Sequence, residues 1–363
     1  MCSARSLAVF LVLGAAGCAQ PVVESDTITV MLNNGQASFE RFSYPATEPR
    51  TMAIGDLNGD SFADVLVIER DGLGVLWGKG NGPPDARSDL ITLSGHPSCI
   101  GIENLDGDQR ADIVVGSSDD ATVSVLLNDG DGLFHIAGEY AAPEIRSLVI
   151  GDYNGDGYQD VAFGVRGAVN VLENRGDGVF SAKAASGAGT ATYSVSAADF
   201  NADGVTDLVM ADLASLDRGD VRFWVGRGDG TFDPGVAYDD VAIRTVRAAR
   251  VTLDNTADVI GTGNGILLLV GDGNGGFGSE FPYVSDSPLS VAVGDFNKDG
   301  IQDLAGIRAR GGIGIRLGVG DGTFLPESSH DAGPSPQELL ATDLDHDGFL
   351  DLVVTSAGTP APL

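Results

Sequence analysis

The sequence predicts an all-β fold: a seven-bladed β-propeller of four-stranded antiparallel blades, the last blade closed by N- and C-terminal strands. Three observations predict it. An Asp-rich segment of nine residues recurs along the chain at one spacing. Strand-like segments accompany each recurrence. The two ends of the chain carry complementary halves of one repeat, so that together they complete a blade.

The recurring segment is represented by DYNGDGYQD at residues 152–160. Related segments start at residues 56, 104, 199, 295 and 343, and an altered one, RVTLDNTAD, starts at residue 250. Successive starts are therefore 48, 48, 47, 51, 45 and 48 residues apart. A period of this length, without a gap, is typical of a propeller blade repeated seven times.

Each repeat contains four segments that are expected to form strands. In the repeat at 289–329, apolar and small residues alternate over 289–296, and two further strands are expected at 301–309 and 312–322. A short fourth strand should follow the Gly-rich turn. One apolar position recurs in the third strand, and a Phe recurs after its turn; both are expected in the core. They are Val30, Val75, Val125, Val171, Phe223, Leu268 and Ile315, and Phe39, Phe134, Phe180, Phe232, Phe277 and Phe324.

The ends of the chain predict how the ring closes. Residues 26–42 resemble the third and fourth strands of a repeat, and residues 337–358 resemble the first and second strands. Joined, they make one blade, and closure leaves no open sheet edge. We therefore expect a propeller domain over residues 26–363, preceded by a signal peptide at 1–17 and a short tether at 18–25.

The N-terminal segment has the pattern of a secretory signal. Arg5 precedes an apolar run at residues 7–13, which is too short to span a bilayer as a helix. The sequence AAGC at 15–18 resembles a bacterial lipobox, although Ala15 stands where Leu is usual. That resemblance implies lipidation of Cys18. Gln20 favours outer-membrane retention by resemblance to Gram-negative lipoproteins. The expectation is an outer-membrane or cell-surface lipoprotein; the alternative is a secreted or periplasmic chain.

Charge and cysteine content restrict the partners. The net charge of −31 argues against nucleic acid and against an anionic membrane surface, so membrane contact is expected through the lipid anchor alone. Once Cys2 is removed and Cys18 is acylated, Cys99 has no intramolecular partner. We expect Cys99 to be a buried small apolar residue and the protein to be a monomer.

The Asp-rich segments predict metal sites. In the loop at 152–160, alternating residues at positions 1, 3, 5 and 9 carry side-chain oxygens, position 7 offers its carbonyl, and Gly157 at position 6 permits a sharp turn. Oxygen ligands in this number suit calcium better than magnesium, and no recurring His or Cys supports zinc. The alternative is that the Asp and Asn residues only shape turns.

These loops, together with Gly-Asp-Gly-x-Phe turns such as residues 228–232, resemble the FG-GAP/VCBS repeats of integrin-alpha-type β-propellers. The resemblance covers roughly residues 25–363. It implies a seven-bladed propeller with calcium between the first two strands of its blades, and up to six calcium sites. The implied ligands are Asp56, Asn58, Asp60 and Asp64; Asn104, Asp106, Asp108 and Asp112; Asp152, Asn154, Asp156, Tyr158 and Asp160; Asp199, Asn201, Asp203, Val205 and Asp207; Asp295, Asn297, Asp299, Ile301 and Asp303; and Asp343, Asp345, Asp347, Phe349 and Asp351.

Three of the seven loops depart from the best pattern. Position 6 is Ser61 in the first loop and Gln109 in the second, so these two should bind calcium more weakly. In the fifth loop Arg250 and Thr252 stand at ligand positions, and we expect no metal there. The Arg250 guanidinium is expected near Asp254 and Asp258, in place of the cation.

The sequence contains no recognisable catalytic set. Its four His residues do not recur in the repeat, and no nucleophile elbow, P-loop or zinc signature is present. The expected function is a non-catalytic calcium-binding module for adhesion or binding at the cell surface, with a surface protein or a glycan as ligand. The alternatives are a carbohydrate-binding lectin and an accessory subunit of a polysaccharide-processing system. A convergent acid pair in the central channel would favour an enzyme.

Overall fold

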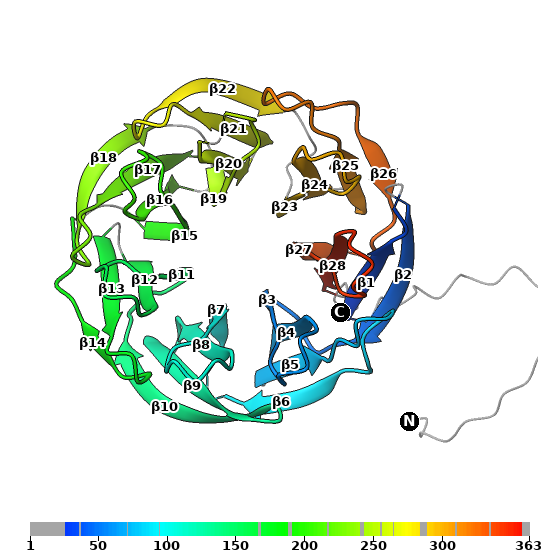
Figure 1. Cartoon of the computed structure of the whole chain (residues 1–363), viewed down its shortest axis with the longest axis horizontal. Coiled ribbons are helices and arrows are strands. Elements are labelled where there is room, and N and C mark those ends of the chain that lie inside the picture. Colours follow the sequence, from blue (N-terminus) through cyan, green and yellow to red (C-terminus); the bar gives the residue numbers. More distant parts are fainter. Residues whose placement is uncertain are drawn as a thin grey trace, which may run out of the picture.

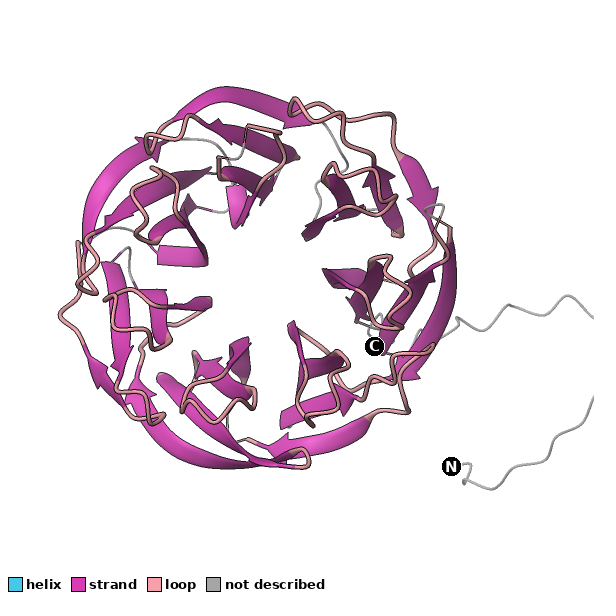
Figure 2. Cartoon of the chain, viewed as in Figure 1, coloured by secondary structure: helices cyan, strands magenta, loops and turns pink. Residues whose placement is uncertain are grey.

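The computed structural model describes residues 26–357 except 36–37, 71, 94, 166–167, 188–190, 216–217, 240–242, 255, 264, 284–288, 309–310 and 334. The expected signal peptide, the tether and the lipidation site Cys18 lie outside the described residues, as do residues 358–363. All named elements of the described part are strands (Figure 2). Within that part no helix is long and apolar enough to span a membrane.

Seven four-stranded antiparallel sheets surround a central opening, as predicted (Figure 1). Written from the innermost to the outermost strand, blades 1 to 3 are β3 (Met52–Gly55), β4 (Asp64–Glu69), β5 (Gly72–Leu76) and β6 (Ser88–Thr92); β7 (Pro97–Glu103), β8 (Asp112–Ser117), β9 (Thr122–Gly130) and β10 (Leu133–Ala141); and β11 (Leu148–Gly151), β12 (Asp160–Val165), β13 (Ala168–Asn174) and β14 (Phe180–Ala182).

The next three blades follow the same order. They are β15 (Ala191–Ala198), β16 (Asp207–Ser215), β17 (Arg218–Gly226) and β18 (Phe232–Tyr238); β19 (Ile243–Ala249), β20 (Asp258–Gly263), β21 (Ile266–Gly271) and β22 (Phe277–Tyr283); and β23 (Val291–Gly294), β24 (Asp303–Ile307), β25 (Ile313–Arg316) and β26 (Ser328–His330).

Blade 7 is built from both ends of the chain. It consists of β27 (Pro336–Thr342), β28 (Asp351–Ser356), β1 (Thr27–Asn33) and β2 (Phe39–Pro45). In the antiparallel pairing of β1 with β28, Thr27 lies opposite Ser356 and Met31 lies opposite Leu352. The predicted closure of the ring is therefore confirmed.

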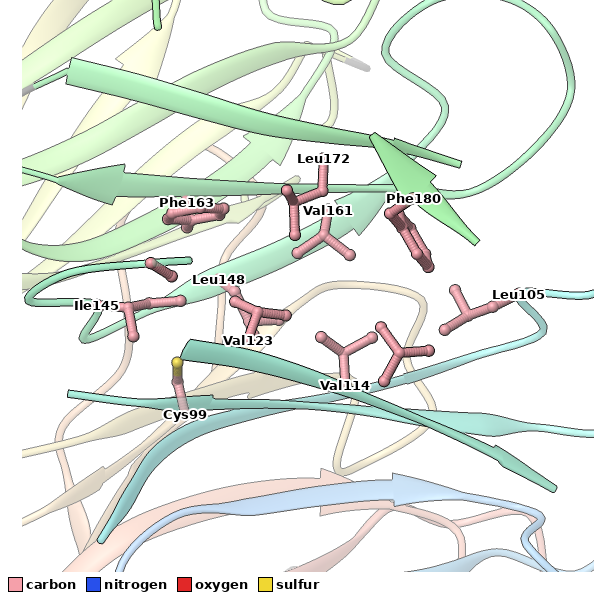
Figure 3. Close-up of a cluster of buried hydrophobic side chains, with 12 residues drawn as sticks. Cys99, Leu105, Val114, Val123, Ile145, Leu148, Val161, Phe163, Leu172 and Phe180 are labelled. Atoms are coloured by element: carbon pink, nitrogen blue, oxygen red, sulfur yellow. The ribbon is translucent and has the colours of Figure 1, made fainter. Parts of the chain in front are cut away.

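The hydrophobic core lies between neighbouring blades. Figure 3 shows one cluster, in which Val114 and Val123 of blade 2 face Val161 and Leu172 of blade 3. The recurring third-strand residues are buried in every blade, at 0–3% exposure. Burying a side chain of this size contributes roughly 1.5–3 kcal/mol, so these layers are the main source of stability. Cys99 belongs to the same cluster, and burial raises the pKa of its thiol to about 12, as expected for a buried apolar residue.

The innermost strands are also linked from blade to blade by side-chain acceptors. The residue five positions before an Asp loop accepts the backbone N–H of the following blade. The donor–acceptor pairs are Val195 N to Ser147 Oγ, Val246 N to Ser194 Oγ, Leu339 N to Ser290 Oγ and Met52 N to Glu338 Oε2. These bonds supply partners for N–H groups that an inner edge strand cannot pair within its own sheet.

Candidate metal centres on one face

The Asp loops join the first strand of each blade to the second. Because all seven first strands run in the same direction through the ring, the loops lie together on one face of the propeller (Figure 1). The predicted ligands at positions 1, 3 and 5 lie in these loops, whereas the Asp at position 9 is the first residue of the second strand, as Asp160 is of β12.

The loop at 152–160 holds its own side chains in place. Asp152 accepts the N–H groups of Gly155 at 2.7 Å and Gly157 at 2.9 Å through its two carboxylate oxygens. Asp156 Oδ1 accepts the N–H of Tyr158 at 2.9 Å, which fixes the residue whose carbonyl was predicted as a ligand. The loops at 56, 199 and 295 repeat the bond from the position-6 N–H to the position-1 carboxylate and the bond from the position-7 N–H to the position-5 carboxylate. The oxygens at positions 1, 3 and 5 are therefore ordered by the backbone.

Position 6 requires a left-handed backbone. Gly157 has φ of 87°, and Ser61 and Gln109 adopt nearly the same conformation, with φ of 70° and 73°. A residue with a Cβ is strained in this region. The first two loops thus reach the common geometry at a conformational cost, which is a physical reason for the weaker calcium binding predicted there.

The Asp at position 9 has a structural role that the sequence did not indicate. Asp160 is fully buried, and its two oxygens accept the N–H of Tyr153 at 3.2 Å and of Asn174 at 2.8 Å. It thereby ties the loop to the end of the third strand. All seven repeats form the same pair of bonds, including Asp258 of the altered fifth loop. A second lone pair remains on each oxygen, so a metal-ligand role for position 9 stays a prediction.

The seventh loop brings three carboxylates together. Ligand oxygens of Asp343, Asp345 and Asp351 lie within 4.8 Å of one another, the one such trio of acidic, His or Cys residues in the described part of the chain. Asp343 Oδ1 is buried and has no hydrogen-bond partner there. Oxygen donors that converge around an unsatisfied buried acceptor fit a hard cation such as calcium.

The raised pKa values of the carboxyls in this cluster also favour a bound cation. Burial, and then the charges of Asp347 and Asp343, raise the pKa of Asp345. Burial raises the pKa of Asp351 to about 7 against two opposing backbone hydrogen bonds. Carboxylates in this arrangement repel one another when they are ionised, and a bound divalent cation would relieve the repulsion.

Two loops satisfy their acidic groups internally. In the second loop the Arg110 guanidinium pairs with Asp108, and its Nε donates to the Asn128 carbonyl at 2.8 Å. The sequence pattern predicts only a backbone carbonyl ligand from position 7, so it does not indicate this side-chain ion pair. In the fifth loop Asp254 accepts the hydroxyl groups of Thr252 at 2.9 Å and Thr256 at 2.7 Å. The predicted placement of Arg250 near Asp254 and Asp258 stays a prediction.

The Gly-Asp-Gly turns after the third strands brace the loops of the preceding blade. Gly230 N donates to the Tyr153 carbonyl at 2.9 Å. In other blades an Asn at the end of the third strand does so through its side chain, as Asn174 Nδ2 does to the Leu105 carbonyl at 2.7 Å. The backbone carbonyl of position 2 in these loops thus accepts a hydrogen bond from the next blade. The geometry of these loops therefore depends on the closed ring.

These observations define a seven-bladed propeller with Asp loops on one face. A family model described as the FG-GAP-like repeat matches residues 104–163, 152–210 and 295–354. Each match starts at position 1 of one Asp loop and ends in the second strand of the next blade. The chain therefore contains FG-GAP-like repeats, at residues 104–210 and 295–354, within a seven-bladed β-propeller. No curated protein shows significant similarity to it.

Solved structures share the fold at low sequence identity. A lectin from Agrocybe aegerita, described as recognising non-reducing terminal N-acetylglucosamine, is 17% identical with a TM-score of 0.60, covering 92% of this chain and 95% of its own. BBS1N, solved in complex with ARL6DN, is 11% identical with a TM-score of 0.61, covering 94% and 100%. Raptor from Chaetomium thermophilum is 15% identical with a TM-score of 0.54, covering 93% and 30%. These likenesses show the fold alone.

Proposed function

We propose that this chain is a non-catalytic, calcium-binding propeller that acts as a binding or adhesion module at the cell surface. The observation that carries the proposal is the seventh loop, where Asp343, Asp345 and Asp351 converge around an unpartnered buried oxygen. FG-GAP propellers are generally binding domains, which supports a binding role over catalysis. Calcium would brace the loop face, and the ligand would be a surface protein or a glycan.

The proposal includes display at the cell surface. A signal peptide over residues 1–17 and lipidation of Cys18 would place the propeller outside the cytoplasm, where millimolar calcium could occupy even weak sites. Metabolic labelling with a palmitate analogue tests this step. Label on the wild-type chain and none on Cys18→Ser is the expected result; label on both would contradict lipidation at Cys18.

A lectin is the second candidate function. The similarity to the Agrocybe aegerita lectin over 92% of this chain favours it, because that protein is described as recognising non-reducing terminal N-acetylglucosamine. Two aromatic residues are excluded from sugar contact, since Tyr153 and Trp224 are buried at 2% and 4% exposure. Tyr158, at 45% exposure, is accessible.

A glycan array, read with the propeller in calcium and again in EDTA, separates the two candidates. Calcium-dependent binding to a glycan is the result expected of a lectin. A clean array, with the fold verified by circular dichroism, directs the search to a pull-down from the cell envelope. If neither the array nor the pull-down retains a partner, the binding function is contradicted.

A further inference from the structure

A cavity of about 1150 Å³ lies at the centre of the ring, on the face opposite the Asp loops. Residues at the beginnings of the first strands of all seven blades line it. Its volume is at the upper end of ordinary small-molecule sites, which span roughly 300–1,000 Å³. The cavity could therefore hold a short oligosaccharide or a ligand of similar size.

Arg247 breaks the repeat pattern in this cavity. It occupies the third position before an Asp loop. The equivalent residues of the other six blades carry no charge; they are Ala53, Gly101, Val149, Ser196, Ala292 and Leu340. The blade does not need an Arg at this position to fold, because six of seven blades lack one. A charge at this position in one blade alone therefore calls for a reason other than packing.

The Arg247 guanidinium is not satisfied by the protein. Within the described residues neither a hydrogen bond nor an ion pair reaches it, and its charged neighbour is Glu338, with which it interacts electrostatically. The side chain keeps some exposed surface because it borders the cavity, but the surrounding protein desolvates it and lowers its pKa. A partly desolvated guanidinium that makes no hydrogen bond to the described residues is suited to an anionic ligand.

Glu338 adds a carboxylate to the cavity lining, opposite in charge to the Arg247 guanidinium. Its Oε2 accepts the Met52 N–H at 2.9 Å. This bond holds the carboxylate in place and leaves it with acceptor capacity. Hydroxyl groups of a ligand are suitable donors to it.

The rim of the cavity carries an aromatic ring. The Arg146 guanidinium carbon lies 4.5 Å from the centroid of the Tyr193 ring, and Tyr193 is 36% exposed. Both residues line the cavity. An accessible Tyr ring offers an apolar surface to the C–H face of a sugar, and Arg146 adds a second positive charge in a protein of net charge −31.

We propose that this central cavity binds an acidic sugar, with the carboxylate at Arg247, hydroxyl groups at Glu338 and the sugar ring against Tyr193. The inference rests on the proposed binding function and specifies its ligand class. A cation without a hydrogen-bonded partner, a fixed acceptor and an accessible aromatic ring together suit a hydroxylated carboxylic acid, because each part of such a ligand finds a complementary group.

Isothermal titration of the calcium-loaded propeller with trigalacturonate tests the proposal. The expected result is binding of the acid, at least tenfold weaker binding of its fully methyl-esterified form, and a similar loss in Arg247→Gln. Arg41→Gln is the matched control, because Arg41 lies in the outermost strand β2, where its exposed pair with Asp331 contributes little. Thermal melts establish that both variants fold.

The comparison of acid and ester on the wild-type protein keeps the test decisive if Arg247→Gln fails to fold. Equal affinity for acid and ester, or affinity unchanged in Arg247→Gln, would overturn the site. So would a peptide with a free C-terminal carboxylate that binds at Arg247 where trigalacturonate does not. If another glycan or an envelope protein binds Arg247→Gln normally, the proposed function stands and this inference fails.

Discussion

The Oε2 atom of Glu338 in β27 accepts a 2.9 Å hydrogen bond from the backbone N–H of Met52 in β3, across the junction of the seventh blade with the first. Ser290 makes the equivalent bond one blade earlier, to the N–H of Leu339 at 3.3 Å. A carboxylate thus takes the place of a hydroxyl at the junction next to the terminal strands.

Replacing Glu338 should weaken the junction. Glu338→Ala leaves the Met52 N–H without an acceptor, and we expect the free energy of unfolding to fall by about 1–3 kcal/mol. Glu338→Gln keeps an acceptor oxygen and should lose less. Thermal melts of both variants in calcium check this. An alanine variant as stable as the wild type would show that the bond is dispensable.

Asp258 allows the structural role of position 9 to be tested in a loop where no metal is expected. This buried residue accepts the N–H groups of Val251 at 2.8 Å and Gly271 at 3.0 Å in a loop where no metal is expected. Asp258→Ala should therefore lower stability by about 2–5 kcal/mol, since two buried donors lose their acceptor. The loss should be the same in EDTA and in calcium, as measured by chemical denaturation. A loss confined to calcium would mean that the fifth loop binds metal.

Calcium stoichiometry should depend on the seventh loop and not on the fifth. Asp345→Ala removes a carboxylate from the cluster with Asp343 and Asp351, and isothermal titration should show one calcium fewer. Asp254→Ala is the control, because Asp254 is satisfied by threonine hydroxyls, and its stoichiometry should match the wild type. EDTA should lower the melting temperature of the wild type. A melt unaffected by EDTA would contradict structural calcium.

The second loop should gain calcium affinity when its internal cation is removed. Arg110 pairs with Asp108, so Arg110→Ala frees a predicted ligand and removes a positive charge from the site. We expect the weakest calcium-binding step to tighten by up to about fivefold, since a partly exposed pair of this kind is worth up to about 1 kcal/mol. Arg227→Ala, which breaks an exposed pair with Asp233 in a turn, should leave every step unchanged. Weaker binding by Arg110→Ala would refute this explanation.

Stability without metal should fall as the pH rises. Burial raises the pKa of position-9 carboxyls above the usual value near 4, to about 6 for Asp64, Asp112, Asp160, Asp207 and Asp303 and to about 7 for Asp351. Between about pH 4 and 7 the folded state binds more protons than the unfolded state, so rising pH favours unfolding. Carboxyls with a lowered pKa, such as Asp254, act only below this window.

In EDTA the melting temperature should therefore be higher at pH 5 than at pH 7.5. Calcium needs ionised carboxylates, so the stabilisation by calcium should be larger at pH 7.5. Measuring at 0.3 M salt screens the repulsion from the net charge of −31, leaving the buried groups as the cause. An EDTA melt that rises between pH 5 and pH 7.5 would contradict the assignment.

The fold could be predicted because periodicity is a local property of the sequence. The spacing of the Asp loops predicted the number of blades. Of the recurring Phe residues, Phe180 and Phe232 are buried at 5% exposure as predicted. The other four are half-buried and pack against the core; they are Phe39, Phe134, Phe277 and Phe324. The role of Asp160 could not be predicted in the same way, because the donor Asn174 belongs to another strand and an Asp looks the same whether it binds a metal or a backbone N–H. The sequence offered one indication of this role: Asp258 is retained at position 9 of the fifth loop, although Arg250 and Thr252 replace ligands there.

The site was predicted less completely for a similar reason. Arg110 stands at a position defined by its carbonyl, so the direction of its side chain toward Asp108 was not contained in the loop pattern. Arg247 and Glu338 lie in strands of different blades, and only the closed ring brings them to one cavity. The repeat pattern predicts features that all blades share, whereas Arg247 and Glu338 each occur in a single blade.

The pairing of β1 with β28 has a consequence for the order of assembly. Thr27 leaves the ribosome more than 300 residues before its partner Ser356, and during that interval one edge of β1 has no strand beside it. Blades 1 to 6 can form from local hairpins, but the last sheet requires contacts between the two most distant parts of the domain, which slows folding. A chain cut short before β28 cannot close the ring, so only a complete propeller domain pairs β1 on both sides and protects it from aggregation and proteolysis.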